Sequence, residues 1–292
     1  MSAEATSDPR GRSSASLVAV PVPSAAARAE NFPVALRVLP RELRVHLLAV
    51  YDAVRLIDDV GDAAEGDRVA RLHALSAELA GLWRGRPAST PELVRLAPTI
   101  EARALPEEPF QRLVAANLQD QRVTRYADAQ ELAGYCALSA APVGRLVLAL
   151  FDAATPQRIA WSDDVCAALQ LLEHLQDVGE DRRAGRVYLP QDALRAAGVP
   201  EDDLDARAAS PALRSVLLAE TGRAAALLSA GPCLVRDLRG WARLAVAGYV
   251  AGGRATVDAL RRSGGEVLAA TPRPRRRDVL RHAAALLVGA TA

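Results

Sequence analysis

The sequence contains no lysine and is poor in aromatic residues. All 36 basic residues are arginines, and with 35 acidic residues the formal net charge is only +1 at pH 7. This balance argues against a general nucleic-acid-binding protein, which carries a clustered positive field. Aromatic residues make up 4% of the chain although half of it is hydrophobic. We therefore expect a core of leucine, alanine and valine, and because alanine and leucine have high helix propensity, this composition favours α-helices.

Cysteines and long apolar runs are also scarce. The three cysteines, Cys136, Cys166 and Cys233, form neither a CxxC pair nor the spacing of metal ligands. This pattern predicts free thiols in a reducing cytosol. No run reaches the roughly 18 uninterrupted apolar residues of a membrane-spanning helix. We therefore expect a cytoplasmic protein.

The first residues resemble a secretory leader only in outline. Arginines precede an apolar stretch at residues 16–22, but Pro21 and Pro23 interrupt it and nearby acidic residues dilute the positive charge. We interpret residues 1–28 as a disordered N-terminal tail rich in serine, alanine and proline. Residues 29–292 are expected to form a single domain, because no shift in composition divides them.

From about residue 30 onward, helical periodicity recurs between short proline and glycine breakers. The one strand-like stretch, Arg186–Pro190, is too short to form a sheet, and the sequence has no G-x-G-x-x-G motif or internal repeat. The sequence therefore predicts an all-α fold, a single large helical bundle. The expected helices cover residues 43–63, 67–83, 91–104, 108–122, 131–140, 143–153, 162–183, 211–229, 233–262 and 277–288.

Two acidic runs lie within these helices: the first acidic run is Asp58–Asp62 (DDVGD), and the second acidic run is Asp177–Asp181 (DVGED). In each run, aspartates four residues apart project from one face of a helix, where like charges repel. The repeated pattern calls for a compensating cation, and Mg²⁺ prefers oxygen ligands from carboxylates and substrate phosphates. The sequence thus predicts a site that holds a diphosphate through magnesium.

Each run also belongs to a longer polar stripe. Tyr51 and Arg55 share a helix face with the first acidic run, and Gln170 and Glu173 share one with the second. Such a stripe would be costly if it were buried without partners. Either run alone is typical of a solvated face or of carboxylates paired with arginine. The presence of two such stripes favours a functional site.

These residues form motifs that resemble the squalene and phytoene synthase family over nearly the whole chain. The first motif, Y-x-x-x-R-x-x-D-D-x-x-D, runs from Tyr51 to Asp62. The second, Q-x-x-x-x-x-Q-D-x-x-x-D, begins at Gln170 and is followed by GRVYLP. The segments at residues 30–35 (ENFPVA) and 119–126 (QDQRVTRY) are similar to the bacterial, hydroxysqualene-forming branch of the hopanoid route. The resemblance implies an isoprenoid synthase fold around a central cavity.

The resemblance also implies roles for the matched positions. Two or three Mg²⁺ ions would bind together with the substrate diphosphate, and aromatic faces lining the cavity would stabilise carbocations. The aromatic residues are Phe32, Tyr135, Tyr188 and Tyr249, and each tyrosine among them has an alternative role as an ordinary core residue with a satisfied hydroxyl. The implied metal ligands are Asp58, Asp59, Asp62, Asp177 and Asp181; the catalytic residues are Tyr51, Arg55, Glu173 and Tyr188; and the substrate-binding residues are Asn31, Phe32, Tyr135, Gln170, Arg186 and Tyr249.

Glu173 departs from the family pattern, because many members have asparagine at this position. We interpret it as a feature of the hydroxysqualene-forming branch, where it would serve as a further metal ligand or accept a hydrogen bond from water. His174 is a candidate base or water-positioning group, with a structural role as the alternative.

The activity implied by the resemblance is the lyase reaction of hydroxysqualene synthase: presqualene diphosphate ionises, rearranges and captures water. One alternative is a prenyltransferase that condenses two prenyl diphosphates head to head, such as farnesyl diphosphate. A second is a catalytically silent member that acts as an assembly factor. The expected partners are these prenyl diphosphates and the enzymes upstream and downstream, with no nucleic acid.

Four arginines precede the apolar C-terminal segment and are suited to anionic lipid. They are Arg273, Arg275, Arg276 and Arg277. We therefore expect transient contact with the inner face of the membrane, with simple packing of a terminal helix on the bundle as the alternative.

Overall fold

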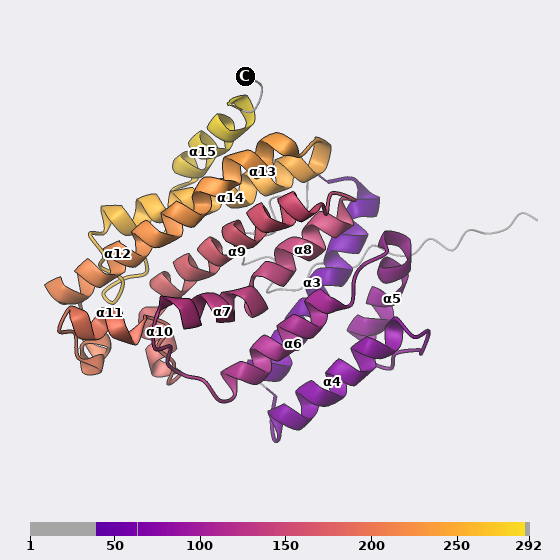
Figure 1. The fold of residues 1–292 in the computed structure, drawn as a ribbon, viewed down its shortest axis with the longest axis horizontal. Coiled ribbons are helices and arrows are strands. Elements are labelled where there is room, and N and C mark those ends of the chain that lie inside the picture. Colours follow the sequence, from indigo (N-terminus) through magenta and orange to yellow (C-terminus); the bar gives the residue numbers. More distant parts are fainter. Residues whose placement is uncertain (1–38, 63, 290–292) are drawn as a thin grey trace, which may run out of the picture.

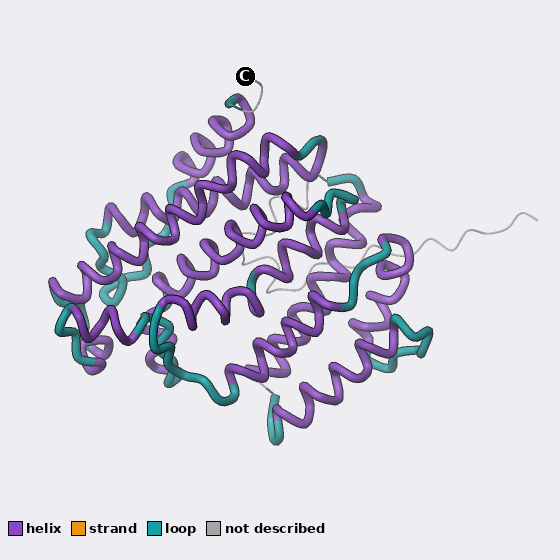
Figure 2. The backbone as a smooth tube through the Cα atoms, viewed as in Figure 1, coloured by secondary structure: helices purple, strands orange, loops and turns teal. Residues whose placement is uncertain are grey.

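The computed structural model describes residues 39–62 and 64–289, and in these residues the predicted all-α fold is confirmed (Figures 1 and 2). The N-terminal tail predicted for residues 1–28 lies outside the described residues. The α-helices are α3 (Arg41–Asp62), α4 (Arg68–Leu82), α5 (Pro91–Arg103), α6 (Glu108–Asp120), α7 (Ala129–Ser139), α8 (Ala141–Leu150), α9 (Pro156–Gln176), α10 (Val178–Arg183), α11 (Gln191–Ala196), α12 (Pro211–Leu227), α13 (Gly231–Asp237), α14 (Gly240–Arg262) and α15 (Arg276–Val288).

The strand-like stretch predicted near residue 186 is extended but forms no sheet. A single parallel bridge joins Val187 to Arg125, and the Val187 N–H donates to the Thr124 carbonyl at 2.9 Å. The contact fixes the segment after α10 against the loop that leads from α6 to α7. It therefore positions Arg186 and Tyr188 next to α6.

The single helix predicted over residues 162–183 is wrong in two respects, because α9 begins earlier, at Pro156, and ends at Gln176, and α10 begins at Val178. Asp177 between them has φ −104° and ψ 13°, although its N–H still donates to the Glu173 carbonyl at 3.0 Å. The second acidic run therefore lies at a bend. The helix predicted over 233–262 is also divided, at Gly240, whose φ of +54° is a conformation that glycine adopts without strain.

The buried residues form two clusters. The first core cluster comes from α3 to α6 and part of α8, with Ile57 and Phe110 among its buried members. The second core cluster comes mainly from α7 and α9 to α15, with Leu172 and Val250 fully enclosed. Phe151 at the end of α8 packs against both clusters. Figure 1 shows α8 and α9 with helices α3 to α6 on one side and the layer of α12 to α15 on the other. The first acidic run, at the end of α3, belongs to the first core cluster, and the second, after α9, belongs to the second core cluster.

The segment Ala129–Leu150, which comprises α7 and α8, is long and apolar enough to cross a membrane, and an 18-residue window within it has a mean hydropathy of 1.5. However, 56% of this window is buried inside the molecule. The two helices pack against α6 and α9. The apolar character of the segment is accounted for by its place in the core.

Glu78 on α4 ties down the turn that leads into α5. Its Oε1 accepts hydrogen bonds from the backbone N–H groups of Ser89 and Thr90 at 2.6 and 2.9 Å, and its Oε2 accepts one from the Thr90 hydroxyl at 2.7 Å. Burial acts to raise the pKa of Glu78, but these hydrogen bonds outweigh it and lower the pKa to about 2. The carboxylate therefore stabilises the fold only when it is ionised.

We expect Glu78→Gln to lower the free energy of unfolding by about 1–2 kcal/mol at pH 7, because the amide loses the charge and one acceptor. The folded-state pKa of Glu78 lies below the ordinary pKa of 4.5 for a glutamate. The contribution is therefore present above pH 4.5 and is lost as the pH falls towards 2. Urea unfolding at pH 7 and pH 3 measures it, with the exposed Glu101→Gln as the control. A loss of equal size at both pH values would contradict the role of the charge.

Candidate functional site

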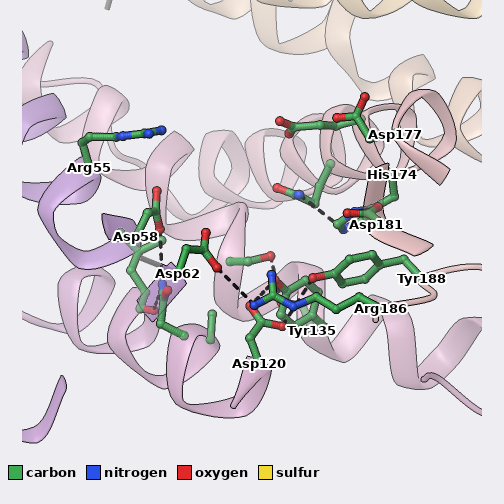
Figure 3. Close-up of a pocket in the computed structure, with 16 residues that line it drawn as sticks. Arg55, Asp58, Asp62, Asp120, Tyr135, His174, Asp177, Asp181, Arg186 and Tyr188 are labelled. Carbon is green, nitrogen blue, oxygen red and sulfur yellow. Dashed lines mark hydrogen bonds and ion pairs between the residues drawn. The ribbon is translucent and has the colours of Figure 1, made fainter. Parts of the chain in front are cut away.

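The carboxylates of both acidic runs line one cavity with a volume of about 310 Å³. Figure 3 shows Asp58 and Asp62 on one side of it and Asp177 and Asp181 on the other. The cavity therefore lies between the two core clusters. Its lining residues are Arg55, Asp58, Asp62, Leu113, Ala116, Asn117, Asp120, Tyr135, Ser139, Gln170, Glu173, His174, Asp177, Asp181, Arg186 and Tyr188.

On the first acidic run, Asp58 is held by α6. Its Oδ1 accepts a hydrogen bond from Asn117 Nδ2 at 3.2 Å. Burial raises the pKa of Asp58 to about 6, although the hydrogen bond from Asn117 acts in the opposite direction. Gly61 allows Asn117 on α6 to pack this close to α3, because a Cβ at position 61 would lie 2.0 Å from Asn117 Oδ1. Gln121 Nε2 donates to the Gly61 carbonyl at 3.0 Å, so α6 holds the last turn of α3 at two points.

Arginine side chains neutralise the other two aspartates of the first acidic run. Arg186 Nη2 lies 3.1 Å from Asp62 Oδ1, and this ion pair crosses the cavity (Figure 3). Arg55 Nε lies 3.0 Å from Asp59 Oδ1 one helical turn away. Both arginines line the cavity. They are suited to a negatively charged ligand, because guanidinium groups bind phosphate oxygens in a bidentate manner.

The second acidic run is less well neutralised. Burial, together with the neighbouring Glu180 and Asp181, raises the pKa of Asp177. Asp181 Oδ2 is buried without a hydrogen-bond partner, and it lies 3.8 Å from His174 Nδ1. On its other edge the His174 ring meets Gln170 Nε2 at 3.3 Å. An orphaned, buried carboxylate oxygen is costly in the absence of a cation.

Tyrosines form the end of the cavity opposite Arg55, around Asp120 (Figure 3). Asp120 Oδ2 accepts a hydrogen bond from the Tyr135 hydroxyl at 2.7 Å, and Oδ1 accepts one from the Tyr188 hydroxyl at 3.5 Å. Tyr188 also stacks on His174, with ring centroids 3.7 Å apart and an interplanar angle of 13°. Burial raises the pKa of both tyrosines, so the hydroxyls remain neutral donors.

The structure brings most, but not all, of the predicted site residues together. Tyr51 and Asp59 on α3 and Tyr249 on α14 do not line the cavity, and Asn31 and Phe32 lie outside the described residues. The predicted residues in the cavity are Arg55, Asp58, Asp62, Tyr135, Gln170, Glu173, Asp177, Asp181, Arg186 and Tyr188.

Asp59 lies outside the cavity for a geometric reason. Because successive residues of an α-helix are about 100° apart, Asp59 lies about 100° from Asp58 and about 60° from Asp62, on the flank of their stripe. Its side chain is 56% exposed and pairs with Arg55. Asp59 thus pairs with Arg55, which lines the cavity, and does not itself face the carboxylates of the second acidic run.

Sequence reasoning missed two residues of α6, Asn117 and Asp120. Both line the cavity, together with Leu113 and Ala116, and the four occupy one helical stripe. The available signal was the presence of an amide and a carboxylate on a stripe that is otherwise apolar.

The donor set fits a hard divalent cation. Four aspartates face one cavity, and one of their oxygens is buried without a partner. Among the described residues, no three His, Cys, Asp or Glu side chains converge on one point to hold a metal ion. An ion here would therefore have few protein ligands and would complete its shell with water or phosphate oxygens, as Mg²⁺ commonly does.

The helical bundle and its cavity define a protein of the isoprenoid synthase class. Residues 25–281 match the family model described as squalene/phytoene synthase, and the chain belongs to this family. The resemblance found in the sequence is thus confirmed, and the enzymes of this family process prenyl diphosphates.

Relatives with different names match the chain over similar lengths. A hydroxysqualene synthase of Rhodopseudomonas palustris is 39% identical over 216 residues, which cover 73% of this chain and 72% of the relative. A presqualene diphosphate synthase of the same organism is 33% identical over 218 residues, or 73% and 77% of the two chains. The solved squalene synthase HpnC of Alicyclobacillus acidocaldarius is 40% identical, with a TM-score of 0.76 over 80% of this chain and 89% of that one.

Proposed function

We propose that the protein is a hydroxysqualene synthase, which converts presqualene diphosphate and water into hydroxysqualene and diphosphate. The observation that carries this proposal is the meeting of the two acidic runs across one cavity that also contains Arg55 and Arg186. The arrangement provides carboxylates for divalent cations and guanidinium groups for a diphosphate. The identity to relatives named hydroxysqualene synthase supports the choice of reaction.

In this reaction, Asp58, Asp62, Asp177 and Asp181 would hold two or three Mg²⁺ ions. When bound, these ions supply Lewis-acid assistance to the departing diphosphate. Arg55 and Arg186 bind and orient the diphosphate, so the carbon–oxygen bond breaks at a fixed place. The bond electrons leave with the diphosphate, and a cyclopropylcarbinyl cation remains on the hydrocarbon.

The tyrosine end of the cavity then controls the cation. Asp120 fixes the hydroxyls of Tyr135 and Tyr188, and the two neutral rings line the end of the cavity, where their π-electrons would stabilise positive charge. After rearrangement, one water molecule adds to the cation through its oxygen, and the proton that it then loses passes to Glu173. We propose that Glu173, which lines the cavity beside His174, accepts a hydrogen bond from this water.

A substrate panel tests the assignment. Purified protein with Mg²⁺ is incubated separately with presqualene diphosphate and with farnesyl diphosphate, and the products are separated by gas chromatography and mass spectrometry. We expect hydroxysqualene from presqualene diphosphate, and no product from farnesyl diphosphate. Omission of Mg²⁺ is the control. Turnover of farnesyl diphosphate to presqualene diphosphate alone would favour the second candidate, a prenyltransferase, which the presqualene diphosphate synthase relative supports.

We also propose that α15 contacts the surface of an anionic membrane, from which a lipid substrate would enter. α15 packs on α14, as one sequence-based alternative predicted, and Asp278 is buried in an ion pair with Arg262 at 2.8 Å. On its exposed side, Leu280 is 69% exposed and the Arg277 side chain is 74% exposed. Exposed apolar and basic groups on one helix are typical of contact with anionic lipid.

Vesicle sedimentation tests this contact. We expect the protein to bind vesicles that contain phosphatidylglycerol in preference to pure phosphatidylcholine, and Leu280→Ser with Arg277→Gln to weaken binding by about tenfold. Leu218→Ser on α12 is the matched control, because Leu218 is also an exposed leucine at 37%. Equal binding by the double variant and the control would contradict the contact.

A further inference from the structure

An ion pair between Arg186 and Asp62 links the two sides of the cavity. Arg186 lies in the segment after α10, on the side of the second acidic run, and Asp62 ends α3 on the opposite side. Arg186 Nη2 donates to Asp62 Oδ1 at 3.1 Å across a sequence separation of 124 residues (Figure 3). The Arg186 side chain is only 22% exposed, so it is held in place within the cavity wall.

The two acidic runs differ in this respect. Arg186 and Arg55 pair with aspartates of the first run. In the part of the chain that the structure describes, no arginine forms an ion pair with Asp177 or Asp181, and the ion-pair partner of Asp181 is the His174 ring, at 3.8 Å. The arginine side chains that line the cavity therefore form ion pairs with the first acidic run and not with the second.

We propose that Arg186 takes the place of a metal ion at Asp62 in the ligand-free protein, and that it exchanges Asp62 for the diphosphate when metal and diphosphate bind together. A divalent cation at Asp62 would compete for the carboxylate and repel the neighbouring guanidinium. A diphosphate removes this conflict, because it offers Arg186 bidentate, charge-assisted hydrogen bonds in return. The first acidic run thus accepts a metal ion readily only in the company of a diphosphate.

This exchange rests on the proposed function only in requiring that the ligand carries a diphosphate. It makes no use of the hydrocarbon, so inorganic pyrophosphate and Mn²⁺ serve as the probes. Failure of the substrate panel with presqualene diphosphate would leave the exchange standing, and failure of the exchange would leave the substrate assignment standing.

The first test is Arg186→Gln, which should change two affinities in opposite directions. Without pyrophosphate, Mn²⁺ should bind about two- to fivefold tighter, because a partly exposed ion pair no longer competes for Asp62. With Mn²⁺ present, pyrophosphate should bind at least about tenfold more weakly, because a charge-assisted contact is lost. Electron paramagnetic resonance of free Mn²⁺ and calorimetry of pyrophosphate measure the two affinities.

Arg183→Gln is the matched control, because it removes the same charge from an exposed position on α10 outside the cavity lining. We expect it to change both affinities by less than about twofold. If Arg186→Gln leaves Mn²⁺ affinity unchanged or lowers it, the exchange is wrong. The same conclusion follows if the control reproduces both effects.

The second variant, Asp62→Asn, breaks the pair from the other side and keeps the test decisive if Arg186→Gln does not fold. The Asp62 side chain is 58% exposed, so the substitution should be tolerated. In EDTA, Asp62→Asn should strengthen pyrophosphate binding about two- to fivefold, because Arg186 is released. The comparison is with Glu65→Gln, an exposed position where the substitution removes a nearby charge without releasing Arg186. Equal binding by the two variants would overturn the proposal.

Discussion

Asp58→Asn should abolish turnover and at the same time stabilise the ligand-free protein. We expect kcat to fall by about 10²- to 10³-fold, because the variant loses a charge that would hold a cation where the leaving group develops its own charge. We expect the free energy of unfolding to rise by an amount on the order of 1–3 kcal/mol at pH 7, because the fold no longer buries this carboxylate in its ionised form. Asp177→Ala should abolish turnover as well.

The pH dependence separates this stabilisation from a general effect. The folded-state pKa of Asp58 is about 6, raised by burial from the ordinary pKa of 3.8 for an aspartate. The folded state thus holds the proton more tightly, and the wild type loses stability as the pH rises from 3.8 through 6. The advantage of Asp58→Asn should be full above pH 6 and vanish below pH 3.8.

Thermal and urea unfolding in EDTA, combined with turnover in Mg²⁺, measure both effects. Asp164→Asn on α9 is the control for turnover, because Asp164 is exposed and lies outside the cavity. Full activity in Asp58→Asn, or a loss of stability at pH 7, would contradict the assignment of Asp58 to the metal site.

Gly61→Ala should disable the same carboxylate without touching it. A methyl group at this position would meet Asn117 Oδ1 at 2.0 Å and Asn117 Cβ at 3.1 Å, so the buried amide must move away from Asp58. We expect a loss of about 1–3 kcal/mol in the free energy of unfolding, from overpacking. We expect a fall of about 10²-fold in turnover, because a displacement of about 1 Å is enough for such a loss.

Gly134→Ala is the matched control, since Gly134 is also a helical glycine but a Cβ there would meet nothing within 4 Å. It should stabilise the protein by up to about 1 kcal/mol through helix propensity and leave turnover unchanged. Combining Gly61→Ala with Asn117→Ala should recover part of the stability but not the turnover, because the hydrogen bond to Asp58 remains absent. Recovery of both would show that packing alone matters.

Local signals explain why much of the fold could be predicted from the sequence. The start of α4 follows from Asp67, whose side chain accepts a hydrogen bond from the Ala70 N–H as an N-cap. The break at Asp177 could not be predicted in this way, because the residues on either side of it keep helical periodicity. The direction that α10 takes after Asp177 is set by tertiary packing.

The residues of the candidate site could likewise be predicted where local spacing places them, and not where tertiary contacts do. The carboxylates of Asp58 and Asp62 could be placed on one face from their spacing, and the repetition of the pattern in the second acidic run predicted a shared metal site. Asn117 and Asp120 were missed because their partners, Asp58 and Tyr135, lie on other helices. The stripe on α6 shows that these two polar residues share a helix face, but a single sequence does not identify their partners on other helices.

The two core clusters give the cavity a mechanical role. One acidic run is anchored in the cluster of α3 to α6, and the other is anchored in the cluster that contains α9. A diphosphate with its ions would therefore add a reversible cross-link between two clusters that also pack together through α8, which contributes residues to both. The departure of the diphosphate in the proposed reaction would remove this added link.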